Sequence, residues 1–266
     1  MTSAKVICES KDQPTVETVS AATLPADPLA NDFASVVTVS ESTICDEPEY
    51  FLYEGPLPVA ALSSARFLPL IFAIKPSPEN PIAGSFALWL YLILTNKNPT
   101  TFVPSWKPGD IDVFFGPASD PHVENKMLRT ALRIVQEVPK TEISTIGSKI
   151  VHLELNEQPD SISAVQLVLH DRTPDSVLGH FDLSVCQVAL TSFSIKKTVG
   201  SETKLTANFV LADKEVKSDI RHGISRFFRD LKLIYRVQKY KERGFLPIQG
   251  PRRELGVFNY LASAKE

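Results

Sequence analysis

The sequence predicts an α+β domain, close to the α/β class, in which helices pack on a mixed central sheet. Apolar and polar residues alternate over Asp110–Phe115, which is the period of a strand, whereas apolar residues recur every three or four positions over residues 122–138, the period of a helix. Short apolar runs suited to strands follow, ahead of a C-terminal region with helical spacing. Hydrophobic residues make up 43% of the 266, enough for a packed core.

The first 50 residues differ in composition from the rest of the chain. They hold two lysines against nine acidic residues, a net charge of −7, and Phe33 is their only aromatic residue before Tyr50. Such a segment buries too little apolar surface to offset the entropy lost on ordering. We therefore expect an acidic, disordered tail over residues 1–50 and a folded core from residue 51 onward.

The core is predicted over residues 51–212. A short helix over residues 60–67 precedes a helix over residues 82–95, which is apolar on every face and therefore buried. A polar loop leads into the alternating strand, and Gly116 and Pro117 end it; Pro139 ends the following helix. The later apolar runs predict strands at residues 149–155, 164–170, 181–190 and 207–211.

Residues 213–266 are expected to form a basic segment that packs on the core and is largely helical to about Arg243. From residue 217 onward this segment holds twelve Lys or Arg against five acidic residues, a net charge of +7. Spacings of three and four place five of the cations on one helix stripe: Arg229, Lys232, Arg236, Lys239 and Arg243. Such a stripe suits phosphate or RNA, or is simply a solvated helix face. Lys239 and Arg243 are the candidate binding residues, and Gly244 is expected to end the helix.

Several classes of protein are excluded or disfavoured by absent patterns. The three cysteines are widely spaced and would leave one unpaired in any disulfide scheme, which favours a reducing compartment. No run of about 18 apolar residues and no secretory leader is present, so we expect an intracellular, cytoplasmic protein without a membrane segment. The histidines lack zinc-ligand spacing, and no GxSxG, P-loop or GxGxxG motif occurs.

Asp110-Ile111-Asp112 is the sharpest chemical signal. Residues two apart on a strand project to the same face, so the two carboxylates lie side by side while Ile111 turns into the core. Unpaired, they would repel each other, and a hard cation such as Mg²⁺ would relieve that repulsion. A solvated sheet edge is the alternative. Asp182, alone among apolar residues, also needs a partner: metal-bound carboxylates nearby, a helix terminus or a salt bridge.

The order of these parts resembles the polymerase-beta-like nucleotidyltransferase superfamily: a Gly-Ser at the first turn of a buried helix, an Asp-x-Asp strand, and a single acid on a later strand. The resemblance covers residues 82–190. It implies that Gly84 and Ser85 bind phosphate, and that Asp110, Asp112 and Asp182 are catalytic and hold two Mg²⁺ or Mn²⁺ ions. The interval of 25 residues from Ser85 to Asp110 exceeds the family's commoner spacing.

The resemblance implies a metal-dependent enzyme that transfers a nucleoside monophosphate from a nucleoside triphosphate such as ATP to a hydroxyl of RNA, protein or a small molecule. Lys239 and Arg243 would add nucleotide contacts, and amides at a helix N-terminus favour anions. One alternative is a catalytically inactive module of the same fold that binds a nucleotide or a protein. Another is an unrelated α+β structural protein in which Gly84 and Ser85 only begin a helix.

Overall fold

The computed structural model describes residues 48–62, 67–156, 162–197, 203–227 and 234–250. Most of the chain predicted to be an acidic tail, residues 1–47, lies outside these ranges. The strands of the described residues are β1 (Glu49–Pro56), β2 (Ile82–Ala83), β3 (Asp110–Phe115), β4 (Thr141–Ile146), β5 (Ile150–Leu155), β6 (Ala164–Leu169), β7 (Val188–Lys197), β8 (Thr203–Leu211), β9 (Ile224–Phe227) and β10 (Leu246–Gln249).

Eight of these strands form one sheet in the order β1-β8-β7-β2-β3-β6-β5-β4, and β9 pairs with β10 in a separate parallel pair. Within the large sheet, β3 and β6 run parallel while the other paired strands run antiparallel. The sheet is therefore mixed, as the sequence predicted.

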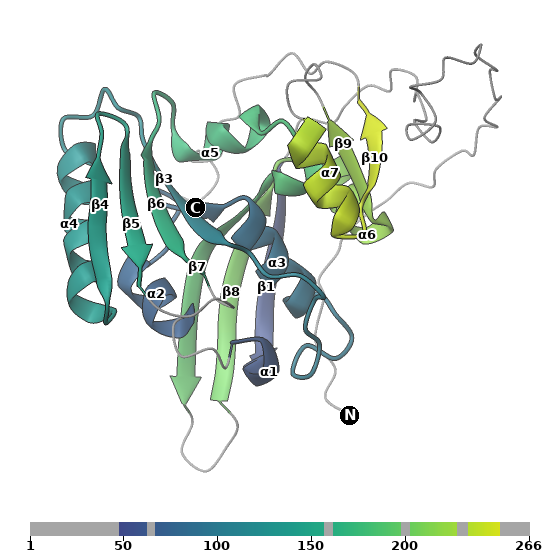
Figure 1. Cartoon of the computed structure of the whole chain (residues 1–266). Helices are drawn as coiled ribbons and strands as arrows, with labels where there is room; N and C mark the ends of the chain where they lie inside the picture. The colour runs from purple at the N-terminus through teal and green to yellow at the C-terminus, as the bar shows by residue number, and fades with distance from the viewer. Residues whose placement is uncertain (1–47, 63–66, 157–161, 198–202, 228–233, 251–266) are drawn as a thin grey trace, which may run out of the picture.

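The helices of the described residues are α1 (Val59–Leu62), α2 (Phe67–Ile74), α3 (Ser85–Leu94), α4 (Val123–Glu137), α5 (Pro174–Val177), α6 (Lys214–His222) and α7 (Ile234–Glu242), with 3₁₀ turns at Leu178–His180 and Ser184–Cys186. The predicted α+β class is confirmed. In Figure 1, α4 lies beside the outer strands β4 and β5, whereas α6, α7, β9 and β10 gather at the opposite side of the view.

Helix α3 is the buried centre of the fold. Nine of its ten residues are buried, and it contacts β2, β3 and β7. The apolar composition on every face predicted this position. Because Gly84 directly precedes α3 and follows β2, the start of the helix is fixed beside the middle of the sheet.

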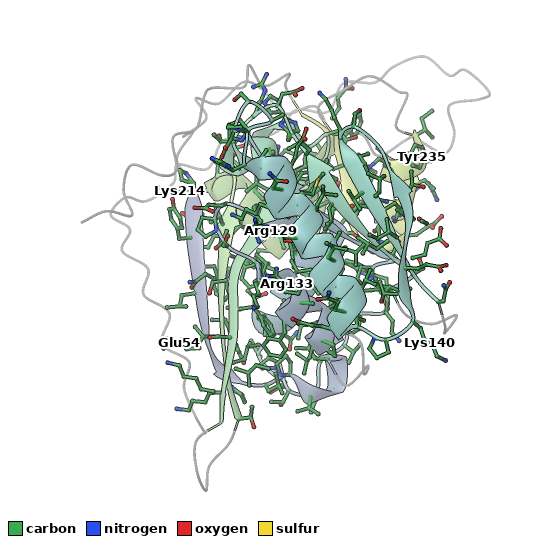
Figure 2. All side chains as sticks on the ribbon, turned by 90° about the vertical axis from the view of Figure 1, so that its left-hand side faces the viewer. Glu54, Arg129, Arg133, Lys140, Lys214 and Tyr235 are labelled. Carbon is green, nitrogen blue, oxygen red and sulfur yellow. The ribbon has the colours of Figure 1, made fainter. Side chains whose placement is uncertain are left out.

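Helix α4 carries the amphipathic pattern that the sequence predicted and packs on β3, β4, β5 and β6. It also lies against α2, where the Arg133 guanidinium donates hydrogen bonds to the carbonyl oxygens of Ala73 and Ile74. These carbonyls belong to the last turn of α2, where no following turn provides backbone amides to donate to them. Figure 2 shows α4 at the front of the molecule with Arg129 and Arg133 along it.

Two edge strands were not predicted. The first, β1, begins at Glu49 and pairs along its whole length with β8, so the folded part begins two residues earlier than expected. The second, β4, pairs only with β5 and is largely exposed. A strand at a sheet edge is hydrogen-bonded on one side only and is weakly buried, so apolar and polar residues alternate only weakly along its sequence.

The predicted strand over residues 181–190 is wrong in its first half. Residues Ser184–Cys186 form a 3₁₀ turn, and β7 begins only at Val188. Leu183 instead forms a bridge with Phe227 of β9, and the amide of Arg226 donates to Ser184 Oγ at 3.0 Å. These contacts connect the segment to the C-terminal region.

The region over residues 213–243, predicted to be largely helical, contains the helices α6 and α7 but is interrupted by the strand β9. Asp213 begins α6 by accepting a hydrogen bond from the amide of Val216 at 2.8 Å, and Gly223 ends it in the left-handed conformation, with φ 67°. The chain then forms β9 before α7 begins at Ile234, and Arg229 and Lys232 of the predicted stripe lie outside the described residues. Gly244, with φ 91°, follows α7 as predicted.

Candidate functional site

The two aspartates of β3 project to the face of the sheet opposite Ile111 and Val113, as the strand period predicted. Ile111 and Val113 are fully buried, whereas the alternate residues Asp110 and Asp112 are only partly buried. Hydrogen-bonded pairing places Ala83 of β2 opposite Asp112. The next residue along the chain, Gly84, therefore arrives beside the aspartates.

Gly84 and Ser85 lie against this carboxylate pair. Gly84 has φ 79°, a conformation that favours glycine, and a Cβ added there would lie 3.5 Å from Asp112 Oδ2. Ser85 Oγ donates to Asp110 Oδ1 at 3.5 Å, a long hydrogen bond. The structure thus brings four of the predicted site residues, separated by 25 positions in sequence, into one place.

The carboxyl group of Asp112 carries a strongly perturbed pKa. Burial and then the neighbouring Asp110 charge raise the pKa of Asp112 to about 7, while Arg236 and Lys239 act in the opposite direction. Because these two cations belong to α7, the C-terminal helix contributes to the field at the aspartate pair. Burial therefore favours the protonated form of Asp112 when no cation is bound.

Asp182 lies on the same side of the sheet, in the loop ahead of the 3₁₀ turn at Ser184–Cys186. The neighbouring Phe181 ring meets the Phe114 ring edge to face, with centroids 5.5 Å apart, and Phe114 shares a strand face with Asp112. Asp182 Oδ2 accepts a hydrogen bond of 2.7 Å from the Arg236 guanidinium. Its other oxygen, Oδ1, is buried and has no hydrogen-bond partner in the described part of the chain.

The third carboxylate therefore pairs with a cation of α7 instead of closing a cluster with the aspartates of β3. Within the described ranges, no three His, Cys, Asp or Glu side chains are arranged to hold a metal ion. Asp182 was expected beside Asp110 and Asp112 on a sheet strand. The irregular backbone at residues 182–187 places it next to Arg236.

The inward face of α7 provides the remaining groups. Arg236, Tyr240 and Arg243 follow one another at spacings of four and three, so they share one side of the helix. Tyr240 is 3% exposed, and its hydroxyl accepts a hydrogen bond of 3.1 Å from the Cys186 thiol. Burial raises the pKa of Cys186 to about 11, so the thiol is an unreactive core group.

The Arg243 guanidinium lies over two aromatic rings. Its guanidinium carbon lies 4.1 Å from the centre of the Trp106 ring and 4.8 Å from the centre of the Tyr240 ring. The interpretation of the basic stripe as a solvated face is therefore wrong for Arg236 and Arg243, although Lys239 is exposed. Sequence analysis did not single out Arg236 because only its partner, 54 residues away, distinguishes it from the other cations.

A polar row continues from Asp112 across the neighbouring strands. Gln166 of β6 lies in register with Asp112, and His152 of β5 lies in register with Gln166. Gln166 and His152 are both partly buried, and the His152 ring is hydrogen-bonded to Ser144 Oγ at 2.7 Å. The sequence could not reveal this row, because strand register is a tertiary property.

Comparison with known proteins leaves the family open. No protein-family model matches the chain, and no curated protein is similar enough to count as a relative. Among the helices of the described residues, none is long and apolar enough to cross a membrane.

Proposed function

We propose that this chain binds a nucleoside triphosphate with Mg²⁺ or Mn²⁺ and transfers its nucleoside monophosphate to a hydroxyl acceptor on RNA, protein or a small molecule. The observation that carries the proposal is the meeting of the Gly84–Ser85 turn with the Asp110 and Asp112 carboxylates. Anion-binding amides and cation-binding oxygens then face the same space, which is what a metal-bound phosphate requires.

The donor set fits a hard divalent cation. Two carboxylates on one strand face supply the oxygen ligands that Mg²⁺ prefers, and burial followed by the Asp110 charge raises the pKa of Asp112, so a bound cation would stabilise its ionised form. The buried, unpartnered Oδ1 of Asp182 is a further oxygen with an unmet need for a positive or hydrogen-bonding group. Asp110 and Asp112 would hold the ion.

The chain's own residues account for substrate binding in this proposal. The amide groups of the first turn of α3 and the Ser85 hydroxyl would bind phosphate oxygens, and Gly84 allows close approach because it lacks a Cβ. Lys239, exposed beside Asp112, would add a positive charge. A bound Mg²⁺ would polarise the phosphate oxygens and offset the charge of the leaving pyrophosphate.

The transfer itself exchanges one oxygen for another at the α-phosphorus. The acceptor hydroxyl oxygen forms the new bond, the bond to the bridging oxygen breaks, pyrophosphate leaves, and the hydroxyl proton passes to solvent. Gln166 and His152 lie in the polar row next to Asp112 and would provide hydrogen bonds for the acceptor side.

An inactive nucleotide-binding or protein-binding module is the second candidate, and one observation favours it. Arg236 already neutralises Asp182, so the carboxylate that the nucleotidyltransferase resemblance assigns to metal is engaged in a salt bridge. A protein that only binds a nucleotide has no need of that ligand. Transfer of a labelled nucleoside monophosphate to an acceptor would distinguish the transferase from the binding module.

The experiment uses nucleoside triphosphates labelled at the α-phosphate, with Mg²⁺ or Mn²⁺ and with RNA, protein and small-molecule acceptors. We expect incorporation by the wild-type chain and its loss in Asp112→Asn. The matched control is Asp120→Asn, which removes an exposed carboxylate that accepts from the amide of His122 in a turn. Incorporation that survives in Asp112→Asn would contradict the proposal, and triphosphate binding without incorporation would favour the binding module.

A further inference from the structure

Three cations on and just after α7, Arg236, Lys239 and Arg243, have different surroundings. Arg236 is committed to Asp182 through a hydrogen bond of 2.7 Å, and Lys239 is exposed and acts on Asp112. Arg243, one position past the end of α7, instead packs against the rings of Trp106 and Tyr240. Its partner is therefore not a carboxylate of the neighbouring site.

The stacking of Arg243 leaves a hydrogen-bonding need unmet. Aromatic rings attract a guanidinium through their faces, whereas its N–H groups point outward in the guanidinium plane. The Nη1 atom of Arg243 is buried, and it has no hydrogen-bond partner within the described residues. A buried donor on a charged group is costly unless an acceptor completes it.

The two rings that contact Arg243 come from segments that also carry residues of the candidate site. Trp106 lies in the loop that enters β3, four residues ahead of Asp110. Tyr240 contacts Cys186, which follows Asp182 by four residues, and it lies one residue after Lys239. Asp182 and Arg243 both act electrostatically on the Cys186 thiol, so an anion bound to Arg243 would lie on the Asp182 side of the candidate site.

We infer that Arg243, clamped by Trp106 and Tyr240, is a preformed docking group for a phosphate. A fork of N–H donors held in one plane matches two phosphate oxygens at once, which a flexible lysine cannot do. The identity of the ligand, the polyphosphate of a nucleoside triphosphate, rests on the proposed function. The docking group itself requires neither metal nor turnover.

Trp106 provides the readout, because its ring touches the guanidinium that would bind the phosphate. Tryptophan fluorescence is followed while inorganic tripolyphosphate is added to the full chain in EDTA, and ATP is titrated in a second series. The other tryptophan, Trp89, is fully buried in α3 and contributes a constant background. We expect a saturable change with both ligands, and its loss in Trp106→Phe.

Two substitutions of Arg243 test the role of the fork. Arg243→Gln removes the charge and Arg243→Lys keeps it, and we expect both to weaken tripolyphosphate binding at least about tenfold, since charge-assisted paired bonds are lost in each. The matched control is Arg129→Gln, which removes a guanidinium from the exposed face of α4, seen at the front of Figure 2. It should bind tripolyphosphate like the wild type. Far-ultraviolet circular dichroism confirms that each variant is folded.

Each outcome has a separate meaning for the two proposals. Tripolyphosphate binding that depends on Arg243, in a chain that transfers no label, supports the docking group and contradicts the transferase. Label transfer together with unchanged tripolyphosphate affinity in Arg243→Gln overturns the docking group alone. A response to a 5′-phosphorylated RNA oligonucleotide but not to tripolyphosphate or ATP also overturns it, because the ligand would then be a nucleic-acid backbone.

Discussion

Replacing Asp112 by asparagine should stabilise the folded chain above neutral pH while it abolishes the proposed metal site. Burial and Asp110 raise the pKa of Asp112 from an ordinary value of 3.8 to about 7. The isosteric amide keeps the size of the side chain but has no charge to desolvate. The variant therefore removes a cost that the wild type carries only when the carboxylate is ionised.

The sign follows from proton binding in the two states. Between the unfolded pKa and the folded pKa, the folded chain holds a proton on Asp112 that the unfolded chain has released. Raising the pH through this window therefore lowers the free energy of unfolding, by about 1.4 kcal/mol per pH unit from this one group, and the loss is complete above the folded pKa of about 7. Over the whole window the loss is up to about 4 kcal/mol.

Urea unfolding in EDTA at pH 5, 6, 7 and 8 measures the effect. Two pH units of the window lie between pH 5 and pH 7, so the stability advantage of Asp112→Asn over the wild type should grow by up to about 3 kcal/mol from pH 5 to pH 8. Addition of Mg²⁺ at pH 8 should then stabilise the wild type and leave Asp112→Asn unchanged, because only the wild type keeps both ligands. The variant Asp120→Asn controls for the loss of one negative charge.

An advantage of Asp112→Asn that is the same at pH 5 and pH 8 would refute the reasoning. It would mean that Asp112 ionises near its ordinary pKa and that the Asp110 and Asp112 side chains are exposed to solvent. The carboxylates would then lack the uncompensated charge on which the metal assignment depends.

Two further predictions concern the groups around the aspartates. Arg236→Gln should lower the free energy of unfolding, measured by urea denaturation, by about 3 kcal/mol, because it leaves the buried Asp182 carboxylate without its cation. Adding Asp182→Asn to the same chain should recover part of that loss. Gly84→Ala should cost about 1–2 kcal/mol, because φ 79° strains any residue with a Cβ, and should weaken ATP binding in isothermal titration calorimetry. Gly109→Ala is its control, since a Cβ there meets nothing within 4 Å, and an equal loss of binding in both variants would contradict the phosphate role of Gly84.

Local patterns in the sequence were sufficient for the centre of the fold. The alternation at Asp110–Phe115 and the helical spacing of α4 are properties of a few consecutive residues, and proline or glycine marks their ends. The same patterns predicted that Asp110 and Asp112 share a face and that α3 is buried, and both expectations are confirmed. Edge strands β1 and β4 were missed because half of their environment is solvent.

What the sequence alone determined is therefore which side chains point together along each element. The tertiary structure decided which elements meet: Asp182 with Arg236 across 54 residues, Trp106 with Arg243 across a longer interval, and Gly84 with Asp112 through the pairing of β2 and β3. Periodicity fixes the direction of a side chain because it follows from local backbone geometry. The partner of a buried charge depends instead on strand register and on how α7 packs, and the spacing of residues in the sequence predicts neither of them.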